Sequence, residues 1–250
     1  MNQDQIMAVS ERLLTAWKTG CRQPSSDLSL DDEASAYAVQ QKVASALGWP
    51  RQSNHRVWKL GGAPGGMISA ALVPELAVHG SGWRVPSTYS MGLGIESEIA
   101  IRLSHDLNGS EEELEVFNAI DEWMPAIELC DTRFVDGGGE NTLLKLADQQ
   151  MSRALIVGAA SKLTSAHDWK LQRAQLKVDG QIRFDQSGSH PFGSPLSNVV
   201  WLARHAASQG MPLMAGDVIA TGSWSGLSWI NEGQAVEVDF HGIGEVLLKV

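Results

Sequence analysis

The sequence predicts an α+β fold in which a mainly antiparallel, rolled or sandwiched β-sheet carries a small helical region at its N-terminus. Within residues 1–50, apolar residues recur at three- and four-residue steps, as in amphipathic helices. Residues 94–103 alternate apolar and polar side chains, and from residue 169 onward strand-like segments predominate. Because few helices separate these strands, hairpin pairing is favoured over a doubly wound α/β fold.

Two helices are predicted before residue 50. The first covers residues 4–18, where Ile6, Val9, Leu13 and Trp17 share one face, and Gly20 ends it. The second begins in a capping box at Ser29, with an acid three residues later, and is ended by Gly48 and Pro50. We expect this pair, residues 1–50, to form a helical subregion on a β-rich body, residues 51–250, within one domain.

The remaining elements follow from alternation and turn residues. The Asp179-Gly180 pair predicts a type I′ hairpin, and Ser194-Pro195 predicts a helix start with serine as N-cap. Residues 61–66 are rich in glycine, residues 67–90 are expected to be irregular, and residues 135–141 form a loop. Strands are predicted at residues 55–60, 94–103, 125–131, 154–158, 169–178, 181–185, 216–223, 235–240 and 245–250, and further helices at 111–120, 142–151 and 195–210.

Composition excludes several classes of function. The 250-residue chain has a net charge of −10 and no basic run, which argues against binding to nucleic acid. It has no apolar run long enough to span a membrane, and its first residues do not resemble a signal peptide. Cys21 and Cys130 lie in no CxxC arrangement and are expected to be reduced thiols of a cytoplasmic protein.

Three carboxylates suggest a metal site. Glu96 and Glu98 lie on one face of the strand at 94–103, roughly 7 Å apart along it, and the strand at 125–131 can bring Glu128 to the pair. At an effective dielectric of 20, unit charges 4 Å apart repel by roughly 4 kcal/mol, so such a cluster must hold protons or a cation. A hard ion such as Mg²⁺ or Mn²⁺ prefers oxygen ligands. Spacing alone more commonly indicates a sheet with one solvated face.

Several segments, in this order, resemble the fumarylacetoacetate hydrolase superfamily, specifically its 2-keto-4-pentenoate hydratase and 4-oxalocrotonate decarboxylase branch. The resemblance extends over nearly the whole chain. It is carried by Ala36-Tyr37-Ala38-Val39-Gln40, Trp58-Lys59-Leu60-Gly61, Ile95-Glu96-Ser97-Glu98-Ile99-Ala100, Pro125-Ala126-Ile127-Glu128, Ala147-Asp148, Pro195-Leu196, Trp201-Leu202-Ala203, Ala215-Gly216-Asp217-Val218-Ile219, Thr221-Gly222 and Gly242-Ile243-Gly244.

The resemblance implies roles for particular residues. Glu96, Glu98 and Glu128 correspond to the family's Mg²⁺ or Mn²⁺ ligands. Lys59, which spacing alone would assign to a solvated charge, corresponds to a lysine that transfers protons. Leu60 and Ser223 correspond to substrate-binding positions. The implied substrate is a small 2-oxo acid or its 2-hydroxydienoate enol, which chelates the ion through its carboxylate and adjacent oxygen, and the implied assembly is a homo-oligomer.

The chain departs from the family pattern in three places. Gly62-Ala63-Pro64 stand where an apolar residue and a hydroxyl residue are usual, and Gln149-Gln150-Met151 replace Asn-Ala-Ser. The segment before the glutamate strand lacks a clear counterpart of the family's acid/base aspartate; Glu75 or His79 could substitute, although exposed loop positions are the more common explanation.

The leading interpretation is a Mg²⁺-dependent hydratase that adds water to a 2-hydroxy-2,4-dienoate in aromatic-compound catabolism. The alternatives are decarboxylation of a diacid like 4-oxalocrotonate, hydrolytic C–C cleavage of an acylpyruvate, and a non-catalytic metal-binding paralogue that pairs with an active subunit. A plain binding module is less favoured, because it gives the three glutamates no purpose.

Overall fold

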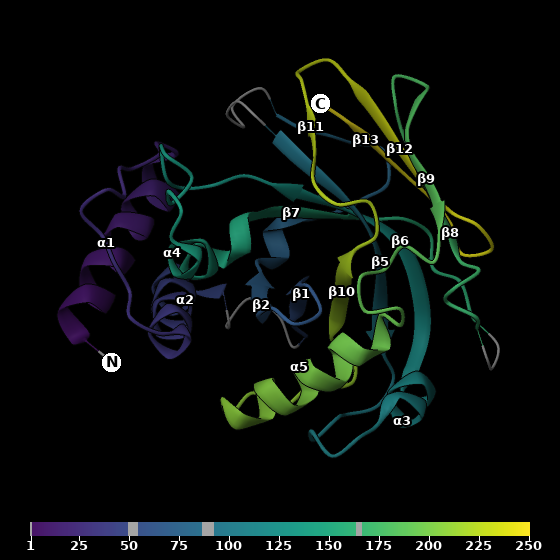
Figure 1. Cartoon of the computed structure of the whole chain (residues 1–250), viewed down its shortest axis with the longest axis horizontal. Helices are drawn as coiled ribbons and strands as arrows, with labels where there is room; N and C mark the ends of the chain where they lie inside the picture. Colours follow the sequence, from purple (N-terminus) through teal and green to yellow (C-terminus); the bar gives the residue numbers. More distant parts are fainter. Residues whose placement is uncertain (1, 50–54, 87–92, 164–166) are drawn as a thin grey trace.

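The computed structural model describes residues 2–49, 55–86, 93–163 and 167–250, and Figure 1 shows their arrangement. Helices at the N-terminus lie beside a body of two curled sheets, so the fold is mixed α+β with mostly strands. The hydrogen bonds between strands define the order of each sheet: one sheet runs β2-β1-β10-β5-β6-β7-β3 with β11 on β5, and the other runs β4-β13-β12-β8-β9.

The N-terminal helices are α1, Gln3–Thr19, and α2, Glu33–Leu47. Asn2 caps α1, and Gly20 ends it in the left-handed region at φ 69°, as predicted. The N-cap of α2 is Asp32, whose side chain accepts from Ser35 N, so the prediction of Ser29 as N-cap is wrong. Pro50, the other predicted end of α2, lies outside the described residues. The two helices pack with Leu144 and Leu146 into their own apolar cluster.

The first sheet contains the strands that carry Glu96, Glu98 and Glu128. Its longest members, β5 and β6, pair antiparallel along their whole length, and β10 pairs with both β5 and β1. The strands are β1 Val57–Gly62, β2 Ile68–Val73, β3 Val78–Gly80, β5 Leu93–Leu103, β6 Ile120–Cys130, β7 Ser152–Val157, β10 Val218–Ser223 and β11 Ser228–Ile230.

The second sheet covers one side of the first through β12 and β13. The strands are β4 Trp83–Arg84, β8 Arg173–Val178, β9 Gln181–Ser187, β12 Ala235–Phe240 and β13 Gly244–Lys249. Asp179 and Gly180 have φ of 51° and 74°, which confirms the type I′ hairpin between β8 and β9. Trp224 and Phe240 contact edge to face between the sheets, with centroids 5.6 Å apart.

One prediction about the strands is wrong. The segment 67–90 is not irregular where it is described, because it contains β2, β3 and β4. In β2 both faces are buried by neighbouring elements, so its small residues Ala70 and Ala71 show no alternation that sequence could reveal. The strand pairing is mainly antiparallel, as predicted, although β1–β10, β3–β7 and β4–β13 are parallel within the described residues.

Three shorter helices complete the described part of the chain: α3 Glu113–Asn118, α4 Thr142–Ala147 and α5 Leu196–Ser208. Single 3₁₀ turns occur at Glu75–Ala77 and Gln149–Met151. The N-cap of α5 is Pro195, one residue after the predicted Ser194, although Ser194 Oγ accepts from Leu196 N at the start of the helix. The helix predicted at 142–151 ends early: Gln149, Gln150 and Met151 all have positive φ, of 52°, 52° and 63°. In the described parts of the chain, no helix is long and apolar enough to cross a membrane.

Candidate metal centre

The β-sheet register brings the three glutamates together. Glu96 on β5 lies directly opposite Glu128 on β6, and Glu98 lies two residues further along the same face. On its other side β5 pairs with β10, where Ser223 is the register partner of Glu98. This face is not a solvated sheet surface, because Glu98 and Glu128 are 0% and 1% exposed. The solvated-face alternative is therefore wrong for these two residues.

Glu98 is a buried carboxylate with one bonded oxygen. Its Oε2 accepts a hydrogen bond of 2.9 Å from Gly222 N, whereas its Oε1 has no hydrogen-bond partner among the described residues. Burial raises the pKa of Glu98, and the charges of Glu128 and Glu96 raise it further. A protein stabilises such a group only by protonating it or by supplying a positive charge.

Glu128 meets the one cationic side chain that lines this site in the described structure. Lys59 Nζ lies 3.1 Å from Glu128 Oε2, and both side chains are almost completely buried. Glu128 Oε1 has no hydrogen-bond partner among the described residues. Burial raises the pKa of Glu128, and the charge of Lys59 opposes that rise without cancelling it.

Lys59 on β1 is 4% exposed, so its assignment as a solvated charge is wrong. Burial by itself lowers the pKa of Lys59, but the carboxylate of Glu128 and the other acids outweigh burial and raise the pKa above its ordinary value. Its Nζ also donates to the carbonyl of Gln150 at 3.4 Å. Lys59 is therefore held as an ammonium group that faces an excess of carboxylates.

Cys130 was not predicted to belong to this site. Its Sγ lies 3.9 Å from Glu96 Oε2, and ligand atoms of Glu96, Glu128 and Cys130 all lie within 4.8 Å of one another. Burial raises the pKa of the Cys130 thiol, and the charges of Glu128 and Glu96 add to that effect, so the thiol is neutral. Strand alternation was the available signal, because Cys130 is two residues after Glu128 on the same face of β6.

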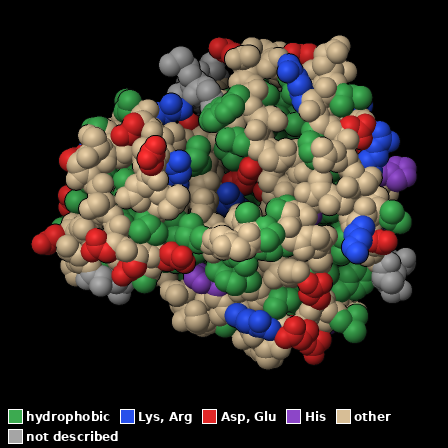
Figure 2. Space-filling view, in the orientation of Figure 1, with side chains coloured by type: hydrophobic (Ala, Val, Ile, Leu, Met, Phe, Trp, Pro, Cys, Tyr) green, Lys and Arg blue, Asp and Glu red, His purple; other side chains and the backbone are tan. Residues whose placement is uncertain are grey.

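A cavity of about 220 Å³ opens above these groups. Figure 2 shows a hollow near the middle of the viewed face, with basic and acidic side chains inside it. The predicted residues Lys59, Leu60, Glu96 and Ser223 line the cavity, and Glu98 and Glu128 lie against them from the sheet. The other lining residues are Gly61, Gly62, Cys130, Gln150, Met151, Pro191, Asn198, Gly222 and Leu227.

Two polar atoms of the cavity wall lack hydrogen-bond partners among the described residues. Ser223 Oγ and Asn198 Oδ1 are both buried, and neither has a hydrogen-bond partner among the described residues. Asn198 Nδ2 donates to the backbone carbonyl of Thr221 at 3.4 Å, so Asn198 Oδ1 points away from Thr221. Asn198 was missed by sequence reasoning, because its position on α5 relative to the cavity depends on tertiary packing.

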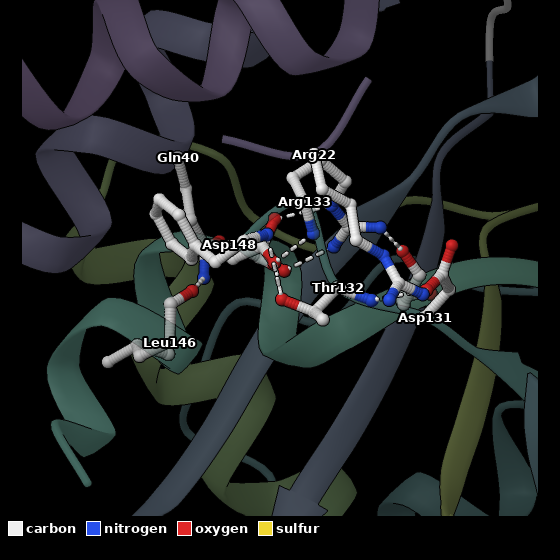
Figure 3. Close-up of polar contacts among 9 residues, drawn as sticks. Arg22, Gln40, Asp131, Thr132, Arg133, Leu146 and Asp148 are labelled. Atoms are coloured by element: carbon white, nitrogen blue, oxygen red, sulfur yellow. Dashed lines mark hydrogen bonds and ion pairs between the residues drawn. The ribbon is translucent and has the colours of Figure 1, made fainter. Parts of the chain in front are cut away.

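A buried ion pair between Arg133 and Asp148 lies just before the wall segment 149–151 in the sequence (Figure 3). Arg133 Nε pairs with Asp148 Oδ1, and Arg133 Nη2 donates to the Asp148 carbonyl at 2.5 Å. Thr132 Oγ1 donates to Asp148 Oδ2 at 2.9 Å. Left-handed backbone costs a non-glycine residue roughly 1–2 kcal/mol, so three such residues in a row need a rigid support. The Asp148 pair directly precedes this segment, and the Gln150 carbonyl accepts from Lys59 Nζ at 3.4 Å.

The two residues considered as substitutes for the family's aspartate do not line this cavity. His79 stacks on Trp83 with ring centroids 3.8 Å apart, and Glu75 lines a separate small pocket with Trp49 and Arg56. The departures at Gly62, Gln150 and Met151 do fall on the cavity wall. They therefore alter the surface that a substrate would meet.

The donor set fits a hard divalent cation. Three carboxylates converge, two of them carry unpartnered buried oxygens, and one ammonium group is present to oppose them. Carboxylate oxygens are the ligands that Mg²⁺ and Mn²⁺ prefer. Among the described residues, ligand atoms of Glu96, Glu128 and Cys130 lie within 4.8 Å of one another, and Glu98 follows Glu96 on the same face of β5.

Comparison with known proteins finds the same family that the sequence resembles. The family model described as "Fumarylacetoacetate (FAA) hydrolase C-terminal" matches residues 70–250. The 2-keto-4-pentenoate hydratase 2 of Dechloromonas aromatica (strain RCB) is 26% identical over 242 residues, which cover 88% of this chain and 86% of that protein. The 2-hydroxyhexa-2,4-dienoate hydratase of Comamonas testosteroni is 29% identical over 154 residues, which cover 60% of this chain and 56% of that protein.

Solved structures share the fold. The 4-oxalocrotonate decarboxylase from Pseudomonas putida G7, complexed with magnesium and adipate, superposes with a TM-score of 0.87 at 22% identity and covers 100% of this chain and 98% of that chain. The fumarylpyruvate hydrolase from Pseudomonas aeruginosa, in complex with Mn²⁺ and pyruvate, has a TM-score of 0.61 at 15% identity and covers 80% of this chain and 93% of that chain.

Proposed function

The chain belongs to the fumarylacetoacetate hydrolase family, and on that premise we propose that it is a Mg²⁺- or Mn²⁺-dependent hydratase that adds water to a 2-hydroxy-2,4-dienoate or its 2-oxo-4-enoate tautomer. The observation that carries this proposal is the group of three glutamates beside Lys59, with unpartnered buried oxygens, at the floor of a 220 Å³ cavity. The names of the curated relatives support the same reaction class.

The polar end of the cavity suits a 2-oxo acid. A cation held by Glu96, Glu98 and Glu128 would supply positive charge for the substrate's carboxylate and its neighbouring oxygen. Ser223 Oγ has no partner among the described residues and can donate a hydrogen bond to that carboxylate. Lys59 lines the cavity wall as an ammonium group, and its Nζ can deliver a proton to a substrate carbon. Hydration places the oxygen of water on one carbon of a double bond and a proton on the other.

The rest of the cavity favours a monocarboxylate. Met151, Pro191 and Leu227 give it apolar walls, and Lys59 is the one cationic side chain among its described lining residues. A second carboxylate, as in 4-oxalocrotonate, would lie among these walls with no described cation to pair with it. Hydration of a dienoate is therefore favoured over decarboxylation of a diacid.

The decisive test is mass spectrometry of the products formed from 2-hydroxypenta-2,4-dienoate and from 4-oxalocrotonate, each with Mg²⁺ and with a chelator. We expect a Mg²⁺-dependent product heavier by one water from the dienoate. A product lighter by CO₂ from the diacid would replace hydration by decarboxylation. If metal binds and neither compound reacts, the chain is a non-catalytic relative or acts on another 2-oxo acid, such as an acylpyruvate.

We also propose that the chain works as a cytoplasmic homo-oligomer. The exposed apolar side chains Leu227 and Trp229 near the cavity support association with another copy, and the unpaired cysteines Cys21 and Cys130 fit a reducing compartment. Light scattering during size-exclusion chromatography tests the first point: a monomer at micromolar concentration would contradict it.

A further inference from the structure

The cavity beside the three glutamates has two sulfur-bearing side chains among its described lining residues, Cys130 and Met151. The Cys130 side chain is buried, and its Sγ lies 3.9 Å from Glu96 Oε2, which belongs to another lining residue. Cys21 is exposed and does not line this cavity. The sulfur of Cys130 therefore faces the proposed metal centre, and the hydratase reaction gives it no role.

The Cys130 sulfur converges with two of the glutamates. Ligand atoms of Glu96, Glu128 and Cys130 all lie within 4.8 Å of one another. The strands set this arrangement, because Glu128 and Cys130 are two residues apart on one face of β6 and Glu96 on β5 is the register partner of Glu128. Glu128 is 1% exposed, and its Oε1 has no hydrogen-bond partner among the described residues. Two oxygen donors and one sulfur donor can therefore reach the same ion.

The spacing of these donors suits a tetrahedral cation. Zn²⁺ binds cysteine sulfur at about 2.3 Å and carboxylate oxygen at about 2.0–2.2 Å, so its donor atoms lie roughly 3.5 Å apart. The 3.9 Å between Cys130 Sγ and Glu96 Oε2 is close to that value. Mg²⁺ prefers oxygen ligands in an octahedron, whereas a thiolate selects softer ions such as Zn²⁺. Cys130 therefore adds a preference for cations that the glutamates alone do not have.

We propose that the cavity also binds thiophilic divalent cations, such as Zn²⁺ and Cd²⁺, with Cys130 Sγ, Glu96 and Glu128 as the protein ligands. On binding, the S–H bond of Cys130 breaks, the proton leaves to solvent, and an electron pair of the sulfur forms the bond to the cation. Glu98 is not part of this ligand group. The inference rests on the metal centre of the proposed function, but not on the hydratase reaction.

Hard and thiophilic cations exclude one another at this centre, because both use Glu96 and Glu128. A hard ion takes Glu98 as its third protein ligand, and a thiophilic ion takes Cys130 in its place. Protein sites generally bind Zn²⁺ more tightly than Mn²⁺, and the sulfur ligand increases that difference. Zn²⁺ and Cd²⁺ therefore displace the hard ion and inhibit the proposed reaction.

Titration of the metal-free protein with Cd²⁺, followed by ultraviolet absorbance, tests the proposal. A bond between Cd²⁺ and a thiolate produces a charge-transfer band, and carboxylate ligands do not. We expect this band in the wild-type protein to saturate at one Cd²⁺ per chain. Cys130→Ser should lose the band, bind Cd²⁺ at least about tenfold more weakly and keep its stabilisation by Mn²⁺. No band in the wild-type protein, or an undiminished band in Cys130→Ser, would overturn the proposal.

Two control variants identify the sulfur and the ligand set. Cys21→Ser removes the exposed thiol and should keep the band, so loss of the band there would overturn the assignment to Cys130. Glu98→Gln should also keep the band while it loses stabilisation by Mn²⁺, and loss of the band in this variant would overturn the proposed ligand set.

A crystal of the wild-type protein grown with Cd²⁺ tests the proposal even if Cys130→Ser does not fold. An anomalous peak at bonding distance from Cys130 Sγ would support it, and a peak bound by carboxylates alone would overturn it. Neither measurement depends on turnover. If the band forms but neither the dienoate nor the diacid reacts, the hydratase proposal fails and the Cd²⁺ site remains.

Discussion

Two buried clusters of charged side chains differ in how completely their polar atoms are hydrogen-bonded. One is the pair of Arg133 and Asp148, and the other is Lys59 with the three glutamates. At Asp148, both carboxylate oxygens and the backbone carbonyl have partners, and Arg133 donates in addition to the Ser152 carbonyl at 2.6 Å. At Glu98 and Glu128, one oxygen of each carboxylate has no hydrogen-bond partner among the described residues. The first cluster balances one charge with one charge; the second sets one lysine against three glutamates.

The difference separates a structural ion pair from a binding site. A buried pair that is fully hydrogen-bonded needs nothing more, and its loss leaves an uncompensated charge in the core. A buried cluster with surplus charge and unpartnered oxygens is stable only when something else is bound. Four predictions test this distinction and one tests the buried His190, beginning with the largest expected effect.

Asp148→Ala should lower the free energy of unfolding by about 3–5 kcal/mol, because it leaves the buried Arg133 guanidinium without its charge partner. Chemical denaturation of the metal-free protein measures the change. Asp148→Asn is the matched control: it keeps the shape and part of the bonding, and should cost less. A loss below about 1 kcal/mol in the alanine variant would mean that this pair does not support the fold.

His190 should make the free energy of unfolding depend on pH. Burial lowers the pKa of His190 from 6.5 to about 4, against a hydrogen bond to the Thr221 carbonyl that opposes the shift. Between pH 6.5 and 4 the unfolded chain binds the proton and the folded chain does not, so stability falls as pH falls through this window. The contribution is about 3 kcal/mol. Denaturation at several pH values should show a shallower dependence in His190→Gln; identical slopes would contradict the assignment.

Lys59→Met should lower turnover of the dienoate by about a hundredfold or more, because it removes the proton carrier at the cavity wall. Removing the ammonium should not weaken Mn²⁺ binding, since the cation then meets only carboxylates. Steady-state kinetics and a Mn²⁺ titration on the same preparation measure both. Wild-type rates in this variant would exclude Lys59 from the reaction.

Glu98→Gln should abolish stabilisation by Mn²⁺. A ligand at a hundred times its Kd stabilises a protein by about 2.7 kcal/mol, and this gain should be present in the wild-type protein and absent from the variant. The metal-free variant should be no less stable than the wild-type protein, because the substitution removes a buried like charge. Equal thermal stabilisation of both proteins by Mn²⁺ would remove Glu98 from the metal site.

Glu112→Gln should have the smallest effect of these substitutions on the free energy of unfolding. Its carboxylate pairs with Arg204 at 2.6 Å, but the side chains are 75% and 54% exposed. Exposed pairs contribute about 0–1 kcal/mol, so the free energy of unfolding should change by less than about 1 kcal/mol. A larger loss would show that burial is not what distinguishes the ion pairs of this protein.

Sequence could predict those features that depend on short-range patterns. The alternation in β5 identified the strand and the shared face of Glu96 and Glu98, and the Asp179-Gly180 pair identified its hairpin. Helices α1 and α2 followed from their apolar spacing, with only the cap of α2 misplaced. The resemblance added Lys59 and Ser223, and these residues line the cavity together with Glu96.

The features that sequence missed depend on contacts between distant segments. Strand β2 is buried on both faces and carries no alternation, so pairing with β1 defines it. The left-handed backbone at Gln149 and Met151 directly follows the buried Asp148 ion pair and ends a helix that local preference would continue. Asn198 reaches the cavity only because α5 packs across the first sheet (Figure 1).

The most direct test of the central claim is an anomalous-difference map from a crystal grown with Mn²⁺. The account predicts one strong peak with carboxylate oxygens of Glu96, Glu98 and Glu128 as its protein ligands, and none beside Asp148. A peak elsewhere, or no peak at an Mn²⁺ concentration that stabilises the protein in solution, would contradict the claim that unpartnered buried carboxylates mark the metal centre.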